Sequence, residues 1–397
     1  MTYAKRVGQL NPSITLAVSA KAKALKAAGE DVVAFGAGEP DFDTPEHIKE
    51  AAIQALRDGM TRYLPAAGWP PLREAVAERY TRLYGLPMTG KNTVITVGGK
   101  HALYNIFQLL LDPGDEAIIP APYWVSYPEM VRLAEGEPVI IPTTEKSGFR
   151  ITPDQLRDAI NYRTRVVVLN SPSNPTGAAY TKKQLAALAQ IAVDKKLWII
   201  SDEIYEELTY GRFRFTSVPT ISPEIAAHTL VVSGAAKTYA MTGWRIGWAI
   251  GPEGVIEMLG RLQSQQTSNA TSFAQAGARA ALIGPQDCVK TMKAAFTQRR
   301  QYILDRLCEI PHVPCPEPEG AFYVFPNFSH YYGKKAGKKV IDGSLALCDY
   351  LLDAVKVAAV PGIGFGADEN IRLSYATSLD QIQEGLDRIQ EAVRALK

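Results

Sequence analysis

The stretch SGAAKTYAMTGWR (residues 233–245) decides the fold, because it joins two short apolar runs. The run before it, Thr229 to Val232, is brief and β-branched, which is typical of a buried parallel strand. The run after it is Ile246 to Ile250. Within the stretch, Lys237 stands among small residues. A hydroxyl, an amine and a guanidinium at neighbouring strand ends can hold a phosphate while the amine meets a carbonyl.

The composition is that of an ordinary globular protein, large enough for two or three domains. The 397 residues are 46% hydrophobic and 21% charged, and the formal net charge is +2. This nearly balanced charge argues against nucleic-acid binding. The four cysteines lack CxxC spacing and the five histidines are scattered, so we expect neither a disulfide framework nor a metal site. No segment approaches a membrane span, and Pro12 and Ser13 interrupt the apolar region near the N-terminus. A cytoplasmic protein without a membrane partner is therefore expected.

Strands and helices alternate through the middle of the chain. The expected strands are Ala117–Pro120, Arg165–Leu169 and Leu197–Ile200, with a helix over Lys182–Asp194. This order predicts an α/β fold with a mostly parallel sheet covered by helices on both faces. Ligands of such sheets bind beyond the carboxyl ends of the strands. The chemically unusual residues fall at those ends: Trp124, Asn174, Asp202, Tyr205, Ser233 and Lys237.

The same patterns predict the remaining elements. Thr44 is expected as the N-cap of a helix with Pro45 at its first position. The other expected helices are 16–28, 72–84, 101–111, 251–282, 286–308 and 379–396, and the other strands are 32–35, 93–97, 320–325, 357–360 and 372–375.

Two glycine-rich segments offer backbone to a ligand. Gly98 and Gly99 come directly before a predicted helix, whose free N–H groups and positive dipole end attract anions. The second segment, Gly36 to Phe42, is a loop with two glycines and a proline. Neither matches a P-loop or a dinucleotide fingerprint, which argues against a nicotinamide dehydrogenase.

Together these motifs resemble the class I pyridoxal-phosphate aminotransferases, specifically the bacterial aspartate aminotransferase branch. The resemblance runs from about Val7 to the C-terminus. It implies a fold-type I transferase with a large domain and a smaller α+β domain, assembled as a homodimer with shared active sites. The implied boundaries are 1–45 for an N-terminal segment joining the small domain, 46–285 for the large domain and 286–397 for the small domain.

The resemblance also assigns the reacting groups. Lys237 would form the Schiff base with pyridoxal phosphate and then carry the proton from the substrate α-carbon. Asp202 would keep the pyridine nitrogen protonated, although an aspartate ending a strand can also be a helix N-cap. Tyr205 and Asn174 would donate to the ring hydroxyl, although the prolines around Asn174 are equally typical of a plain turn. Trp124 would stack on the ring, with Ile204 on its opposite face.

The phosphate would be held by groups from three segments. These are the N–H groups of Gly99 and Lys100, the side chains of Ser233 and Arg245, and Tyr63 from the partner chain. Many relatives carry a serine where this chain has Ala236.

Substrate recognition is assigned to arginine and lysine. Arg372 would clamp the α-carboxylate, helped by Asn174 and the backbone of Gly38, although a solvated arginine on an edge strand is the common alternative. Lys100 would hold the distal carboxylate, unless it serves only the phosphate. Thr15 lies in a segment resembling the loop that closes over the substrate, and several relatives carry a lysine at the position of Asn11.

The expected function is transfer of an amino group between aspartate or glutamate and 2-oxo acids, namely 2-oxoglutarate and oxaloacetate. The mechanism is ping-pong, and prephenate is a possible second acceptor as in bifunctional relatives. The alternatives are an aromatic or alanine aminotransferase, a carbon–sulfur lyase on the same fold, and a pyridoxal-binding regulator. A regulator would need a DNA-binding domain, for which the sequence leaves no residues.

Overall fold

The computed structural model describes residues 3–397, which are built around a seven-stranded sheet. The strand order is β2-β8-β7-β6-β5-β3-β4. Only β8 within the sheet runs antiparallel to its neighbours, β2 and β7. The strands are β2 (Thr93–Thr96), β3 (Glu116–Pro120), β4 (Glu137–Ile141), β5 (Thr164–Asn170), β6 (Trp198–Asp202), β7 (Thr229–Gly234) and β8 (Gly247–Ile250). The predicted α/β class with a mostly parallel sheet is confirmed.

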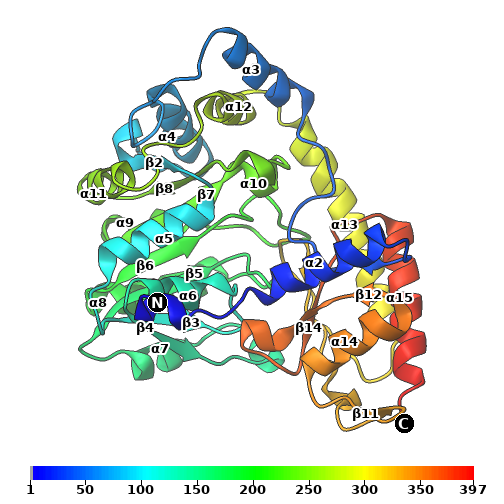
Figure 1. Ribbon diagram of the computed structural model, residues 1–397. Coiled ribbons are helices and arrows are strands. Elements are labelled where there is room, and N and C mark those ends of the chain that lie inside the picture. The colour runs from blue at the N-terminus through cyan, green and yellow to red at the C-terminus, as the bar shows by residue number, and fades with distance from the viewer. Residues whose placement is uncertain (1–2) are drawn as a thin grey trace.

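Helices cover both faces of this sheet (Figure 1). Alternate strand residues point to opposite faces, and both sets are buried, which is why β7 is apolar along most of its length. One face packs on α5 (Gly99–Leu110), α6 (Ser126–Leu133) and α11 (Glu253–Ser264). The other packs on α4 (Pro70–Tyr84), α7 (Pro153–Ala159), α8 (Lys182–Asp194), α9 (Pro223–Ala227) and α12 (Ser272–Ile283). Helix α3 (Glu46–Arg57) lies outside α12.

The C-terminal part has its own core and is entered through the long helix α13 (Asp287–Cys308). Its antiparallel sheet has the order β13-β14-β9, and β10 pairs with β11. These elements are β9 (Tyr323–Val324), β10 (Lys335–Ala336), β11 (Lys339–Val340), β13 (Val360–Pro361) and β14 (Ile371–Ser374), with α14 (Ser344–Val355) and α15 (Leu379–Arg394).

The N-terminal residues pack on this C-terminal part. Strand β1 (Val33–Ala34) pairs in parallel with β12 (Val357–Ala358). Helix α2 (Ile14–Ala27) crosses in front of the C-terminal part in Figure 1, and its Ala22 belongs to a small buried cluster with Leu352. The N-terminal residues thus contact the C-terminal part, and the domain boundaries at residues 45 and 285 stay a prediction.

Several predicted elements differ from those observed. Thr44 is not a helix N-cap: its hydroxyl donates to the Ala240 carbonyl and accepts from the Trp244 indole, while Pro45 takes the capping position. The single helix predicted over 251–282 is two helices, because residues 265–271 turn the chain between α11 and α12. No prediction was made for β4, α6, α7 or α14, which have short or mixed patterns.

Within residues 3–397, no helix is both long and apolar enough to cross a membrane. The cytoplasmic location stays a prediction.

Candidate active site

The carboxyl ends of β5, β6 and β7 form one wall of the candidate site. In the parallel pairing, Asn170 lies opposite Asp202, and Asp202 lies opposite Val232. Ser233, the next residue of β7, is buried, and Lys237 follows in the short helix α10 (Ala235–Thr238). The register therefore brings together three of the segments that the sequence predicted to meet.

Lys237 presents its amine to the loop that follows β1. Its Nζ donates to the Gly38 carbonyl at 2.5 Å and lies 6.0 Å from the centre of the Phe322 ring. Burial lowers the pKa of the Lys237 amine to about 8; Glu39 opposes this, and Arg372 and Arg245 add to it. A substantial fraction of the amine is therefore neutral at pH 8, which a nucleophile requires.

Asp202 is 4% exposed, and hydrogen bonds hold both carboxylate oxygens. Tyr127 donates its hydroxyl to Oδ2 at 2.6 Å, and the Ile204 N–H donates to Oδ1 at 3.3 Å. Burial raises the pKa of Asp202 to about 6, against the lowering effects of these two hydrogen bonds and of Lys237. The residues after Asp202 form turns, so it does not begin a helix.

Arg372 is 2% exposed and lies in β14, the central strand of its sheet. The alternative of a solvated arginine on an edge strand is therefore wrong. Its Nη1 donates to Asn174 Oδ1 and its Nη2 to the Gly36 carbonyl, both at 2.9 Å. The Nε atom is buried and has no hydrogen-bond partner within residues 3–397. Such an atom needs a partner from a ligand or water.

Tyr205 and Tyr323 join Asp202 to Arg372. The two hydroxyls lie 3.0 Å apart, and the Arg372 guanidinium lies 4.5 Å from the centre of the Tyr323 ring. Sequence reasoning identified Tyr205 but missed Tyr323, which it placed only in a predicted strand. Tyr127 was also missed, because its contact with Asp202 spans 75 residues of sequence.

The N-terminus of α5 lies against the antiparallel strand β8. A Cβ at Gly247 would lie 2.4 Å from the Gly99 nitrogen, and a Cβ at Gly98 would lie 2.5 Å from Nη2 of Arg245. Glycine at these positions lets the Arg245 guanidinium approach the first turn of α5. Arg245 itself has a positive φ of 56° and donates to the Thr242 carbonyl at 2.9 Å. The first N–H groups of a helix lack intrahelical acceptors, so those of Gly99 and Lys100 are free to donate to a ligand beside Arg245.

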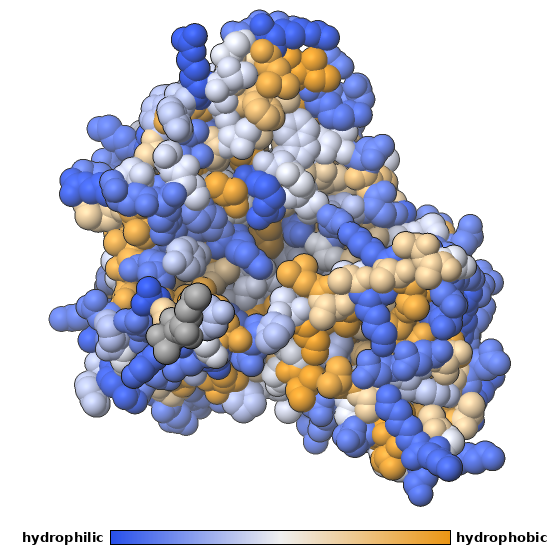
Figure 2. All heavy atoms as spheres, in the orientation of Figure 1, coloured by the Kyte–Doolittle hydropathy of each residue, from blue (hydrophilic) through white to orange (hydrophobic). Residues whose placement is uncertain are grey.

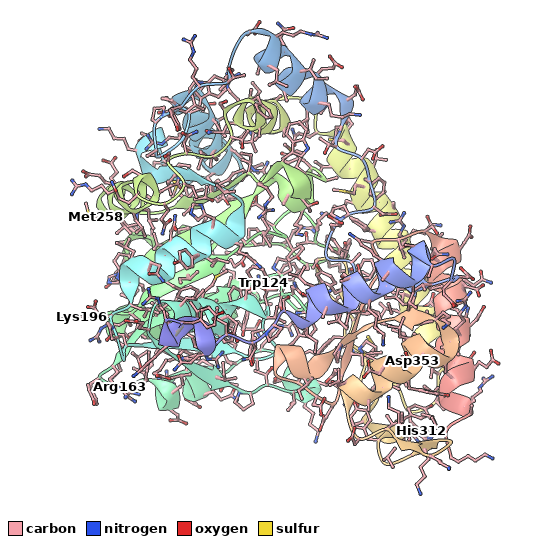
Figure 3. All side chains as sticks on the ribbon, in the orientation of Figure 1. Trp124, Arg163, Lys196, Met258, His312 and Asp353 are labelled. Atoms are coloured by element: carbon pink, nitrogen blue, oxygen red, sulfur yellow. The ribbon has the colours of Figure 1, made fainter. Side chains whose placement is uncertain are left out.

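Trp124 and Lys100 lie beside that corner. The Lys100 Nζ is 5.0 Å from the centre of the Trp124 ring, and Figure 3 shows Trp124 between α5 and α2. Burial and the nearby Arg245 lower the pKa of Lys100. Lys100 and Arg245 line a cavity of about 510 Å³, together with His101, Tyr104, Glu129 and Thr267 among others. Figure 2 shows the surface hollowed near the centre of the same view, with hydrophilic side chains at the rim.

Two predicted site residues lie apart from this group in the single chain. The Tyr63 side chain is 89% exposed. The Thr15 hydroxyl lies 3.0 Å from that of Ser13 at the start of α2. The segment before it is anchored to α6, since Asn11 donates through its backbone and side-chain nitrogens to Glu129.

Comparison with known proteins gives consistent findings. The family model "Aminotransferase class I and II" matches residues 30–389. An aspartate aminotransferase of Geobacillus stearothermophilus is 50% identical over 395 residues, which is 100% of both chains. A probable aspartate/prephenate aminotransferase of Aquifex aeolicus is 45% identical and covers 99% of each chain.

Solved structures give the same result. The aspartate aminotransferase of Rhizobium meliloti has a TM-score of 0.96 at 42% identity and 100% coverage of both chains. That of Thermus thermophilus with maleate has a TM-score of 0.93 at 45% identity, covering 99% of this chain and 100% of the other.

The titration of Lys237 gives a first prediction. In the ligand-free protein, its reaction with an amine-acylating reagent should rise with a midpoint near pH 8, because only the neutral amine reacts. Mass spectrometry of the peptide that carries Lys237 measures the extent at each pH. Glu39→Gln should move the midpoint to lower pH, because Glu39 stabilises the charged amine. A midpoint near pH 10 in the unmodified chain would contradict the assignment.

Proposed function

Because the chain belongs to the class I and II aminotransferase family, we propose that it moves an amino group between aspartate or glutamate and 2-oxo acids. The cycle is ping-pong and uses pyridoxal phosphate, with 2-oxoglutarate and oxaloacetate as acceptors. The observation that carries this proposal is the convergence of a buried carboxylate, a buried guanidinium and the Lys237 amine at one sheet edge. The relatives' names, which specify aspartate, favour this over an aromatic or alanine aminotransferase or a lyase.

The residues present fit the cofactor. The glycines beside Arg245 and at the start of α5 leave a corner without Cβ atoms, where a phosphate can approach the backbone. When bound, pyridoxal phosphate supplies an aldehyde for amines and a ring that accepts electrons from the substrate α-carbon. Trp124 and Ile204 would hold the flat ring, and Tyr205 and Asn174 its hydroxyl.

The phosphate would be held at the start of α5. The N–H groups of Gly99 and Lys100 and the side chains of Ser233 and Arg245 would bind it. Ala236 removes one hydroxyl that many relatives have there, so the helix N-terminus and Arg245 carry more of the binding in this chain.

Two residues would handle protons. Asp202 would hold the protonated ring nitrogen through a charge-assisted hydrogen bond, because its neutral donors Tyr127 and Ile204 do not neutralise its buried charge. Lys237, whose amine is partly neutral near pH 8, would carry the proton from the substrate α-carbon to the cofactor in the first half of the cycle and in the reverse direction in the second.

Two cations would bind the substrate carboxylates. Arg372 would bind the α-carboxylate, because a guanidinium matches a carboxylate with two parallel hydrogen bonds. Asn174 and the backbone of Gly38 already border the Arg372 and Lys237 side chains. Lys100, whose amine lies 5.0 Å from the centre of the Trp124 ring, would bind the distal carboxylate, and Thr15 would close over it.

A second acceptor, prephenate, is proposed on narrower grounds. Several similar proteins are named aspartate/prephenate aminotransferases. The pair Lys100 and Thr15 matches that group, whereas Asn11 is engaged by Glu129 in this chain.

The proposed assembly is a homodimer with shared sites. Tyr63, with its side chain 89% exposed, would reach the phosphate of the other subunit. Tyrosine is among the residue types enriched at the energetically important positions of protein interfaces.

The central test follows the cofactor and the amino group together. Protein loaded with pyridoxal phosphate should transaminate aspartate and glutamate, and borohydride should attach the cofactor to Lys237 alone. Mass spectrometry locates the attachment, and Lys237→Ala is the control that should show neither result. Attachment to another lysine, or no transfer with either amino acid, would overturn the proposal.

Lys100 distinguishes distal-carboxylate binding from phosphate binding. Lys100→Ala should lower kcat/KM for aspartate roughly 10- to 100-fold, the value of a hydrogen bond to a charged group, and change that for alanine or phenylalanine far less. Lys100→Arg, which keeps the charge, is the matched control and should retain most of the preference. Equal losses across the panel would mean that Lys100 serves only the phosphate.

Shared sites can be tested by mixing two inactive chains. Lys237→Ala and Tyr63→Phe chains, each shown to be impaired alone, are exchanged under mild denaturation. A mixed dimer then contains one intact site, so activity should return in proportion to the mixed dimers formed. Mixed dimers proven by mass spectrometry yet inactive would rule out the arrangement.

A further inference from the structure

We propose that Tyr127 is a positioning residue that keeps the Asp202 carboxylate ionised and aimed at the cofactor's ring nitrogen. This inference rests on the proposed function, and it adds a residue of α6 to a site otherwise assembled from strand ends and glycine-rich turns.

The contact between the two side chains is short and buried. Tyr127, 1% exposed, donates its hydroxyl to Oδ2 of Asp202 at 2.6 Å, within the range of charge-assisted O–H···O⁻ bonds. The Ile204 N–H, in the turn that directly follows β6, donates to the other oxygen. With its oxygens held from α6 and from the turn after β6, the carboxylate cannot rotate freely.

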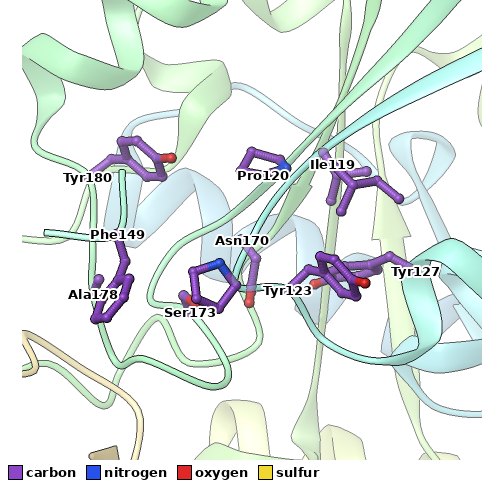
Figure 4. A pocket seen from close by; sticks show the side chains of 11 residues that line it. Ile119, Pro120, Tyr123, Tyr127, Phe149, Asn170, Ser173, Ala178 and Tyr180 are labelled. Atoms are coloured by element: carbon purple, nitrogen blue, oxygen red, sulfur yellow. The ribbon is translucent and has the colours of Figure 1, made fainter. Parts of the chain in front are cut away.

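The Tyr127 ring is itself fixed in place. It packs edge-on against Trp124, with the ring centres 5.4 Å apart and the planes at 83°. Its other side faces a small cavity of about 20 Å³, room for about one water, that Tyr123 and Asn170 also line (Figure 4). The Asn170 amide donates to the Asp202 carbonyl. Residues that line this cavity therefore hydrogen-bond both the backbone and the side chain of Asp202.

The Tyr127 hydroxyl lowers the pKa of Asp202, and few other groups act on that pKa. The titratable groups facing Asp202 are Tyr127 from α6, Lys237 from α10 and Tyr205 from the following turn. Burial raises the pKa of Asp202, and the Tyr127 hydrogen bond is the largest of the effects that oppose it. Burial and the Asp202 charge raise the pKa of Tyr127 well above its ordinary value, so it stays a donor throughout the working pH range.

Removing the hydroxyl should therefore make the Asp202 carboxylate harder to keep ionised. Tyr127→Phe keeps the ring, its contact with Trp124 and nearly all of its volume. A hydrogen bond to a charged group corresponds to a pKa change of roughly 1 to 2. Asp202 is a carboxylate above its pKa and is protonated below it. As the pH falls, protonation of Asp202 should therefore begin at a higher pH in the variant than in the unmodified chain.

The experiment follows Asp202 directly in the cofactor-free protein. Carbon-13 NMR of aspartate-labelled protein reports the titration, and Asp202→Asn identifies the resonance. The midpoint, near pH 6 in the unmodified chain, should rise by about 1 to 2 in Tyr127→Phe. Tyr123→Phe, which removes a hydroxyl from the same cavity wall, is the matched control and should leave it unchanged. An unmoved midpoint in Tyr127→Phe, or an equal move in both variants, would overturn the proposal.

A second variant keeps the hydroxyl of residue 127 and should shift the Asp202 midpoint in the opposite direction. A 3-fluorotyrosine at position 127 is a more acidic, stronger donor and should lower the Asp202 midpoint. If Tyr127→Phe does not fold, this variant alone decides: a midpoint that stays or rises contradicts the proposal.

Enzyme kinetics separate this inference from the proposed function. In cofactor-loaded Tyr127→Phe, the acid limb of the kcat profile should move to higher pH, so the deficit is larger at pH 6.5 than at pH 8.5. A merely structural residue would lower kcat equally at both. If the unmodified chain transfers no amino group, the proposed function fails, while the NMR titration still decides the role of Tyr127.

Discussion

The pairing of Asn170 with Asp202 across β5 and β6 is the constraint on which the rest of the site depends. Because parallel strands end at one edge, this register sets the depth of Asp202 relative to Ser233 and to the first residues of α10. The reversed strand β8 then brings Arg245 and the N-terminus of α5 to the same edge, through backbone contact that only glycine allows at Gly247. The side chains of Asp202 and Ser233 are thus fixed by the most buried part of the sheet.

The electrostatic character of the site follows from what surrounds this edge. Lys237, Arg372, Arg245 and Lys100 converge there, whereas Asp202 and Glu39 are the carboxylates that act on Lys237. The excess of cations creates a positive potential in a partly enclosed site, which favours ligands bearing several negative charges. A phosphate-bearing cofactor and a dicarboxylic amino acid both meet that condition. Neutral amino acids would gain less from the same field.

Much of the fold and of the site could be predicted where the signal was local. Asp202 ends an apolar run and Lys237 stands among small residues, so short windows of sequence singled these two out. Their roles, and the role of Arg372, came from the family resemblance. Tyr127 and Tyr323 could not be found in this way, because each acts through a partner 75 or 118 residues away. The prediction that Thr44 is an N-cap was wrong for the same reason, because its hydroxyl donates to the distant Ala240 carbonyl instead of capping the helix. The loop between α11 and α12 was missed although its Thr267-Ser268-Asn269 cluster is a local loop signal.

The N-terminal segment acts as a tether whose length limits how the two halves can separate. Asn11 is bonded to Glu129 on α6, while Ile14 packs tightly against Gly364 and joins a cluster with Phe365 of the C-terminal part. Three residues of extended chain reach at most about 10–11 Å. If the C-terminal part moves farther from α6 than this, the Asn11–Glu129 hydrogen bonds must break or Ile14 must leave its contacts with Gly364 and Phe365. Because Glu129 also lines the cavity that holds Lys100 and Arg245, a change at this contact would be felt directly at the candidate site.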